Sequence, residues 1–257
     1  MMLMSAMIFF DAYYLLPPLF LLTLLVPTAR SLSSPPPNTV LCFGETLWDA
    51  LPSGLFLGGG PTNVALHLAS LGTPTSLVTC LGRDRLGNEA HRRLAQGGVG
   101  TRPIQRTDKY GTGMVLATLG DGGDATYEFD TPSAWDVIDP HGASLDAALE
   151  DAEVVVLGSL CSRLGGAEGG TSAAAAARVR GHRGAVVLDL NLRPPWYDVE
   201  HIKGLIRGTP ADGPLALLKV NEEELPEAEK WFGIRAASGS LAGAALGARM
   251  RALAEAT

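Results

Sequence analysis

From residue 39 onward, short apolar runs alternate with stretches whose apolar residues recur at helical spacing. The apolar runs are rich in Val and Leu and predict strands over 40–43, 76–81, 154–157, 185–190 and 215–220. The intervening stretches predict helices over 64–71, 86–96, 171–180 and 199–207. Strands that alternate with helices in this way form βαβ units. The pattern therefore predicts an α/β fold, with a parallel sheet sandwiched by helices.

Residues 111–130 break this alternation. Their sequence, GTGMVLATLGDGGDATYEFD, consists of two extended runs joined by an Asp-Gly-Gly-Asp turn, which is typical of a β-hairpin. We expect this hairpin to project from the sheet as a small flap, or lid, over the carboxyl edge where α/β folds bind ligands. An antiparallel edge of the main sheet is the alternative, because mixed sheets are common.

The first 38 residues differ from the rest of the chain. Residues 1–26 carry one charge, Asp11, and the uncharged run 12–26 is interrupted by Pro17-Pro18, so it favours a targeting peptide over a membrane anchor. An upstream extension of the reading frame is a third interpretation, because the usual basic start is missing. Residues 31–38, SLSSPPPN, are a proline-rich linker.

These features divide the chain into a targeting-like segment with its linker, 1–38, and a folded domain, 39–257. We expect a soluble protein in the cytoplasm or an organelle, with membrane contact only through an uncleaved first segment. The formal net charge is −7 and no basic run occurs, so nucleic acid is not an expected partner. Cys42, Cys80 and Cys161 lie far apart and match neither a zinc pattern nor a complete disulfide framework, which predicts packed, reduced thiols.

Several common catalytic motifs are absent from the sequence. No lysine directly follows a glycine, which excludes a Walker-type phosphate loop, and neither HExxH nor GxSxG occurs. The cluster Gly58-Gly59-Gly60 precedes a predicted helix, as in a dinucleotide fingerprint. However, Asn63 stands where the third glycine would be and no predicted strand directly precedes the cluster, so a Rossmann site is not expected.

The glycine-rich segment 58–82, GGGPTNVALHLASLGTPTSLVTCLG, carries the most information. Glycines let backbone N–H groups approach a ligand, and we expect Asn63 to open a helix whose free N–H groups favour ligand oxygens. By itself the segment is also compatible with an ordinary turn capped by Thr62 or Asn63. Its spacing resembles the first signature of the pfkB/ribokinase family of sugar kinases. The matching positions are Gly59, Gly60, Pro61, Asn63, Ala65, Gly72 and Gly82.

This resemblance implies a ribokinase-like fold in which Gly59, Gly60 and Asn63 bind the sugar. The segment 43–49, FGETLWD, resembles the first strand of fructokinase-like members, whose aspartate binds two sugar hydroxyls. Asp49 takes that position, and a carboxylate at the end of a first strand can accept both hydrogen bonds. A turn or helix cap is its alternative role. Asp84, in GRDxxG, is expected to cap the following helix and is not assigned to the site.

Three further segments resemble fructokinase-type sequences. They are 127–136, the motif Asp189-x-Asn191-x-Arg193, and Asn221-x-x-Glu224. Asn191 and Arg193 follow a predicted strand, so they lie at the ligand edge or fasten the Pro194-Pro195 turn, and position alone does not decide between these roles. The resemblance implies that Asn221 and Glu224 order Mg²⁺ and its waters near the phosphates of ATP, with Glu224 at the metal. The acidic residues also suit a helix start by themselves.

The resemblance ends before the family's G-A-G-D turn, whose aspartate is the catalytic base and whose N–H groups bind the transferred phosphate. No such turn occurs, and 239–256 reads as an alanine-rich helix, so the last part of the fold and the base are expected to be missing. The resemblance implies ATP-dependent phosphorylation of a sugar hydroxyl, with little activity from this chain alone. The alternatives are a non-catalytic sugar-binding or interaction fragment and a nucleoside kinase of the same fold. A homodimer formed through the lid is also compatible with the resemblance.

Overall fold

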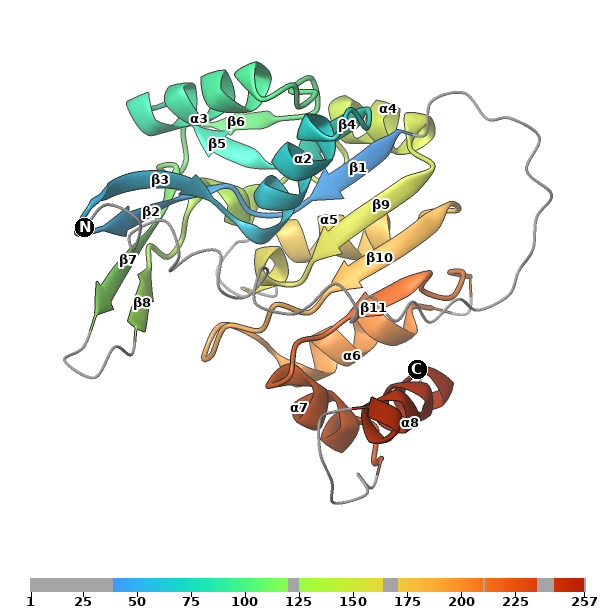
Figure 1. The fold of residues 1–257 in the computed structure, drawn as a ribbon. Helices are drawn as coiled ribbons and strands as arrows, with labels where there is room; N and C mark the ends of the chain where they lie inside the picture. Colours follow the sequence, from blue (N-terminus) through green and yellow to red (C-terminus); the bar gives the residue numbers. More distant parts are fainter. Residues whose placement is uncertain (1–38, 120–124, 164–170, 210, 235–242, 257) are drawn as a thin grey trace.

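A computed structural model describes residues 39–119, 125–163, 171–209, 211–234 and 243–256. At its centre lies a five-stranded sheet in the order β11-β10-β9-β1-β4, and every neighbouring pair is parallel (Figure 1). Its strands are β1 (Val40–Phe43), β4 (Thr75–Val78), β9 (Val154–Gly158), β10 (Ala185–Asp189) and β11 (Leu217–Lys219). The predicted α/β class with a parallel sheet is confirmed.

Helices cover both faces of this sheet, as strand β1 shows most clearly. Val40 and Cys42 pack in one apolar cluster with side chains of α2 and α3, whereas Leu41 and Phe43 pack on the opposite face with side chains of α4, α5 and α6. These helices are α2 (Gly60–Ser70), α3 (Arg85–Gln96), α4 (Ala143–Asp151), α5 (Ser172–Arg180) and α6 (Val199–Arg207). A strand buried on both sides is apolar throughout, which explains why VLCF does not alternate.

A separate four-stranded sheet, in the order β3-β2-β7-β8, forms the lid. Its strands are β2 (Leu47–Leu51), β3 (Gly54–Gly58), β7 (Gly113–Leu119) and β8 (Ala125–Phe129). The lid lies at the carboxyl end of the main strands (Figure 1). The predicted hairpin is therefore present and does not belong to the main sheet; its Asp-Gly-Gly-Asp turn lies outside the described residues. The β2–β3 hairpin that completes the lid was not expected from the sequence.

Several boundaries differ from the prediction. The strand expected at 76–81 is two strands, β4 and β5 (Cys80–Gly82), and β5 pairs with β6 (Gln105–Thr107). Helix α2 begins at Gly60 instead of residue 64, because Pro61 is tolerated in a first turn. Strand β3 directly precedes the glycine turn, so the expectation that no strand does so was wrong.

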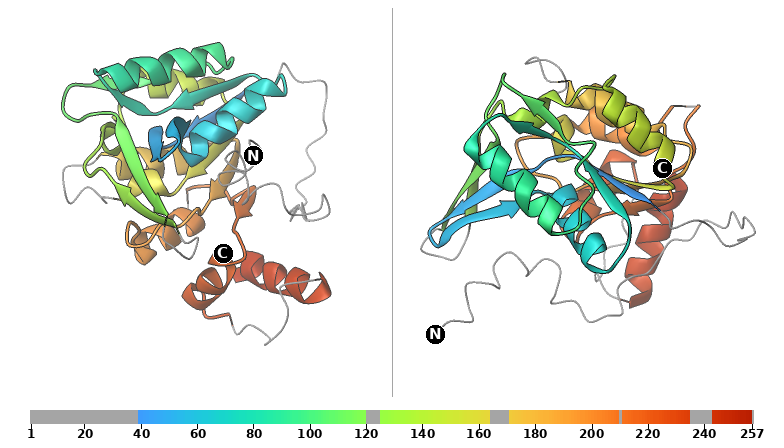
Figure 2. Two further views of the ribbon diagram at one scale, coloured as in Figure 1. Left: turned by 60° about the vertical axis from the view of Figure 1, so that its left-hand side comes forward. Right: turned by 90° about the horizontal axis from the view of Figure 1, so that it is seen from above.

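The last described helices lie below β11 in Figure 1 and are seen from two further sides in Figure 2. They are α7 (Glu224–Trp231) and α8 (Gly243–Ala256). Two short 3-10 helices occur earlier in the chain, η1 (Ala134–Val137) and η2 (Leu160–Ser162). The Arg249 guanidinium of α8 donates to both carboxylate oxygens of Glu229 on α7, at 2.7 and 2.6 Å. The predicted helical tail is thus confirmed over 243–256, while 239–242 lie outside the described residues.

The three cysteines are buried and unpaired, as their spacing predicts. In the part of the chain that the structure describes, no helix is long and apolar enough to cross a membrane. The targeting-like segment and its linker, 1–38, lie outside the described residues.

Candidate functional site

Asp49 lies in strand β2 of the lid, opposite Phe56 of β3 and beside Val115 of β7. Asp49 therefore lies in the second strand and not at the end of the first, β1, which ends at Phe43. Its place within a strand excludes a role as a turn or helix cap. No hydrogen bond from the described residues reaches its carboxylate. Burial raises its pKa to about 6, and the positive charge of Arg193 opposes this rise. A partly buried carboxylate with open lone pairs can accept two hydroxyl donors at once.

Gly58, the last residue of β3, makes room for this carboxylate. It pairs with Leu47 across the β2–β3 ladder. A Cβ at residue 58 would collide with Oδ2 of Asp49, so any side chain there would displace the carboxylate. Gly58 is therefore a further residue on which the site depends, although the sequence marked it only as a member of the glycine cluster.

The turn at Gly59 and Gly60 joins the lid to helix α2. Gly59 has a φ of +109°, and a Cβ there would overlap the carbonyl oxygen of Glu45, so this position requires glycine. The Gly60 N–H donates to Oε1 of Glu45 at 2.8 Å, which means that this amide is already bonded within the protein.

The alternative role of Thr62 or Asn63 as a side-chain cap was wrong, because α2 has no side-chain cap hydrogen bond. Thr62 is buried, and its hydroxyl donates to the Glu45 carbonyl at 3.0 Å. Asn63 is exposed in the first turn of α2 and does not open the helix. Sugar binding by Gly59, Gly60 and Asn63 stays a prediction.

Glu45 is a site residue that the sequence analysis missed. Its side chain is only 1% exposed, and its buried Oε2 has no hydrogen-bond partner among the described residues. Burial raises the pKa of Glu45 to about 7; the charge of Asp189 adds to the rise, while amide hydrogen bonds and Arg193 oppose it. The available signal was a carboxyl side chain between two apolar segments, two residues after the end of the predicted strand 40–43.

The end of β10 and the loop that follows it carry charged side chains that act on the carboxyl groups of Glu45 and Asp49. Asp189, at the end of β10, forms an ion pair of 2.8 Å with Lys219 of β11. Asn191 adopts a left-handed conformation with φ of +40°, which asparagine tolerates better than most residues. The charge of Arg193 acts on both Asp49 and Glu45, and its carbonyl accepts from the Trp196 N–H at 2.7 Å. The carbonyl contact shows that Arg193 fastens the Pro194-Pro195 turn, whereas a ligand-binding role for Arg193 stays a prediction.

Asn221 and Glu224 bind each other and the loop after β10. The two carboxylate oxygens of Glu224 accept from the backbone N–H groups of Leu192 at 2.7 Å and Asn221 at 2.9 Å. In return, the Asn221 side-chain oxygen accepts from the Glu224 N–H at 2.8 Å. Burial raises the pKa of Glu224, against the lowering effect of these two amides. The motif thus joins the loops that follow β10 and β11.

These contacts limit how Mg²⁺ fits the site. Glu224 is 4% exposed and both of its oxygens are engaged by amides. Among the described residues, no group of three or more His, Cys, Asp or Glu side chains is arranged to hold a metal ion. These amide contacts do not favour direct coordination of Mg²⁺ by Glu224, and its predicted part in ordering the ion and its waters stays a prediction.

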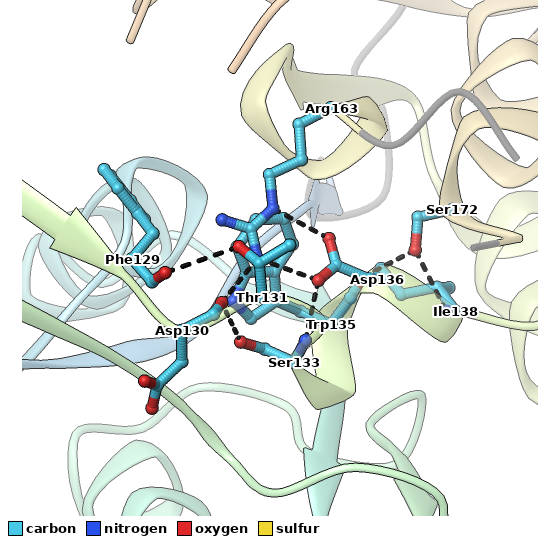
Figure 3. Close-up of polar contacts among 9 residues, drawn as sticks. All are labelled: Phe129, Asp130, Thr131, Ser133, Trp135, Asp136, Ile138, Arg163 and Ser172. Atoms are coloured by element: carbon cyan, nitrogen blue, oxygen red, sulfur yellow. Dashed lines mark hydrogen bonds and ion pairs between the residues drawn. The ribbon is translucent and has the colours of Figure 1, made fainter. Parts of the chain in front are cut away.

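Arg163 fixes the base of the lid (Figure 3). Its side chain is fully buried, and its guanidinium donates to both Asp136 carboxylate oxygens at 3.0 and 2.8 Å and to the Asp130 carbonyl at 2.8 Å. The same cation lies over three rings, with centroids at 3.9 Å for Trp135, 5.3 Å for Trp196 and 5.7 Å for Phe129. Because Phe129 ends β8 and Trp196 follows β10, these contacts join the lid to the main domain.

Asp84 caps helix α3, as predicted. Its Oδ1 accepts from the Gly87 N–H at 2.6 Å. The same carboxylate accepts from the N–H and hydroxyl of Thr112 at 2.7 and 2.8 Å, just before lid strand β7. Its bonds are used within the protein, which agrees with leaving it out of the site.

The fold and site define a parallel α/β domain with a β lid that carries a partly buried carboxylate, Asp49. Residues 43–248 match the family described as pfkB family carbohydrate kinase, and the chain belongs to this family. It is 31% identical over 170 residues to a fructokinase of Salmonella typhimurium, which covers 62% of this chain and 53% of that protein.

Solved structures show the same likeness. A fructokinase of Xylella fastidiosa with bound ATP superimposes with a TM-score of 0.66 at 25% identity, over 84% of this chain and 65% of that one. A 2-dehydro-3-deoxygluconokinase of Thermotoga maritima shares the fold, with a TM-score of 0.69 at 21% identity over 85% of this chain and 69% of that one. The chain spans about half the length of the curated relatives it matches.

Proposed function

We propose that this chain carries the sugar-binding part of a fructokinase-like kinase, which transfers the γ-phosphate of ATP to a sugar hydroxyl. The open carboxylate of Asp49 carries the proposal, because it lies in the lid with no protein donor among the described residues and Gly58 leaves it space. Two sugar hydroxyls donate to Asp49, and the turn at Gly59 and Gly60 with Asn63 supplies further polar contacts. The likeness to fructokinases favours a sugar over a nucleoside.

In the proposed reaction, the sugar hydroxyl oxygen forms a bond to the γ-phosphorus while the bond to the bridging oxygen of ADP breaks. The hydroxyl proton needs a base. The family resemblance places that base in a G-A-G-D turn, which this sequence does not contain. We therefore propose that the chain alone binds sugar and does not transfer phosphate at a useful rate.

Asn221 and Glu224 support the nucleotide side of this proposal. They order the loops after β10 and β11 at the carboxyl edge, where α/β folds bind ligands. When bound with ATP, Mg²⁺ would neutralise phosphate charge there, and these residues would act on its water shell.

The lid also supports a homodimer. Leu55 and Leu116 are 46% and 49% exposed, and both lie beside Ala50 on one face of the lid, away from Asp49. A second copy would cover these apolar side chains. Sedimentation of the wild type and of a Leu55→Ser variant tests this, with a dimer expected only for the wild type.

Two assays on the full chain test the proposed function. Calorimetry with D-fructose should detect weak binding, of roughly millimolar affinity or about −4 kcal/mol, and no binding of adenosine. A coupled ADP-release assay with fructose, ATP and Mg²⁺ should give no turnover. Binding of adenosine in place of fructose would support a nucleoside kinase, and turnover near ~1–100 s⁻¹ would mean that the chain holds a base that we have not assigned.

A further inference from the structure

Glu45 connects the end of strand β1 to the start of helix α2. Its Oε1 accepts from the Gly60 N–H at 2.8 Å, and its carbonyl oxygen accepts from the Thr62 hydroxyl at 3.0 Å. A third bond, of 2.7 Å, joins the hydroxyls of Thr46 and Thr62. Of these three contacts, only the one to Gly60 involves a group that titrates.

The second carboxyl oxygen of Glu45, Oε2, accepts no hydrogen bond from the described residues. Oε2 is buried without a hydrogen-bond partner and lies beside Gly158, where a Cβ would be 3.6 Å from it. A buried polar atom without a partner costs free energy, and an ionised one costs more. The environment therefore opposes ionisation of Glu45, while the Gly60 N–H at the helix start favours it.

Three charged or titratable groups from neighbouring elements face Glu45. The negative charge of Asp189, at the end of β10, favours the neutral acid, and the positive charge of Arg193 favours the carboxylate. The buried thiol of Cys161, in η2, is raised in pKa by burial and by the nearby Glu45 charge, so it stays neutral. The balance among these groups brings the pKa of Glu45 to about 7.

We propose that Glu45 is a positioning residue for the sugar site, which clamps the Gly59–Gly60 turn as a carboxylate and loosens it as a neutral acid. The proposal rests on the proposed function, in which this turn contacts the sugar. A carboxylate accepts an N–H more strongly than a carboxylic acid does, so deprotonation tightens the bond to Gly60. Because Glu45 is only 1% exposed, solvent screens this change little.

The amide of Gly60 reports the clamp directly. In NMR spectra of the full ¹⁵N-labelled chain between pH 5 and pH 9, the Gly60 amide resonance should shift with a midpoint near pH 7. In Glu45→Gln, whose amide oxygen still accepts from Gly60 but does not ionise, this transition should vanish. Thr62→Val is the matched control. It removes the neutral hydrogen bond from the Thr62 hydroxyl to the Glu45 carbonyl and should keep the transition.

Calorimetry with D-fructose on the same samples tests the link to the site. Wild-type affinity should fall roughly fivefold as pH drops through 7, since a charge-assisted bond is replaced by a neutral one. Glu45→Gln should lack this step and keep only the decrease near pH 6 that protonation of Asp49 causes. Thr62→Val should keep both steps.

The outcomes separate the two proposals. If the wild-type Gly60 amide shows no transition near pH 7, or if Glu45→Gln shows the same one, the clamp is refuted. If the transition is present but measurable fructose affinity does not follow it, the positioning role is refuted. If the wild type binds no fructose while the Gly60 transition is present, the proposed function fails and the clamp itself is supported.

Discussion

Replacement of Asp49 by Asn should stabilise the fold while removing sugar binding. Burial raises the pKa of Asp49 from 3.8 to about 6, so the folded state opposes its ionisation. Below pH 3.8 the carboxyl is neutral in the folded and unfolded chains, and the shift has no effect on stability. Between pH 3.8 and 6 unfolding releases a proton, so wild-type stability falls as pH rises; above pH 6 the loss is complete.

The shift of about two pKa units corresponds to about 3 kcal/mol, and about 2 kcal/mol after allowance for the partial exposure of Asp49. Asp49→Asn does not ionise and escapes this cost. Urea unfolding should therefore show the variant about 2 kcal/mol more stable than wild type at pH 8 and nearly equal to it at pH 4. Glu45, His182 and His201 also have shifted pKa values, but they are common to both proteins and cancel in the difference.

Asp108→Asn is the matched control, because this exposed carboxylate pairs only at the surface with Arg83. Its stability should differ from wild type by less than about 0.5 kcal/mol at either pH. A stability difference for Asp49→Asn that is the same at pH 4 and pH 8, or that favours the wild type at pH 8, would refute the reasoning.

Two further substitutions test the surroundings of the site. Gly58→Ala should weaken fructose binding at least tenfold with an unchanged circular dichroism spectrum, because the methyl group displaces the Asp49 carboxylate; Gly204→Ala, at an open helix position, should leave binding unaltered. Arg163→Met should lower the free energy of unfolding by about 3–5 kcal/mol in urea titrations, since it leaves the Asp136 carboxylate buried without its cation. Adding Asp136→Asn should recover part of that loss, and no recovery would contradict the assigned pairing.

The main sheet could be predicted from the sequence because its strands are short, apolar on both faces and separated by helices. The start of α2 could not. Gly60 is a poor helix former in isolation and Pro61 suits only the first turn of a helix, and the Gly60 N–H at the start of α2 donates to Glu45, fifteen residues earlier in the chain. The β2–β3 hairpin was also missed, although the Pro-Ser-Gly sequence at 52–54 is a turn signal between two apolar segments.

The candidate site divides in the same way. A family pattern singled out Asp49 as a candidate, whereas its place in strand β2 and the space that Gly58 leaves for its carboxylate came only from the structure. Glu45 and Arg163 carry no local pattern: the partners of Arg163 lie 27 and 33 residues away along the chain. The role of a buried charged side chain depends on partners that are distant along the chain, and a single sequence does not show which residues these are.

Calorimetric titration of D-fructose into the wild type and Asp49→Asn at pH 8 tests the central claim most directly, with Asp108→Asn as the control. At this pH the Asp49 carboxylate is ionised. The account predicts roughly millimolar binding by the wild type and the control, and a loss of at least tenfold in Asp49→Asn, because hydrogen bonds to a charged acceptor contribute about 1.5–3 kcal/mol each. Equal fructose affinity in the wild type and Asp49→Asn would contradict it.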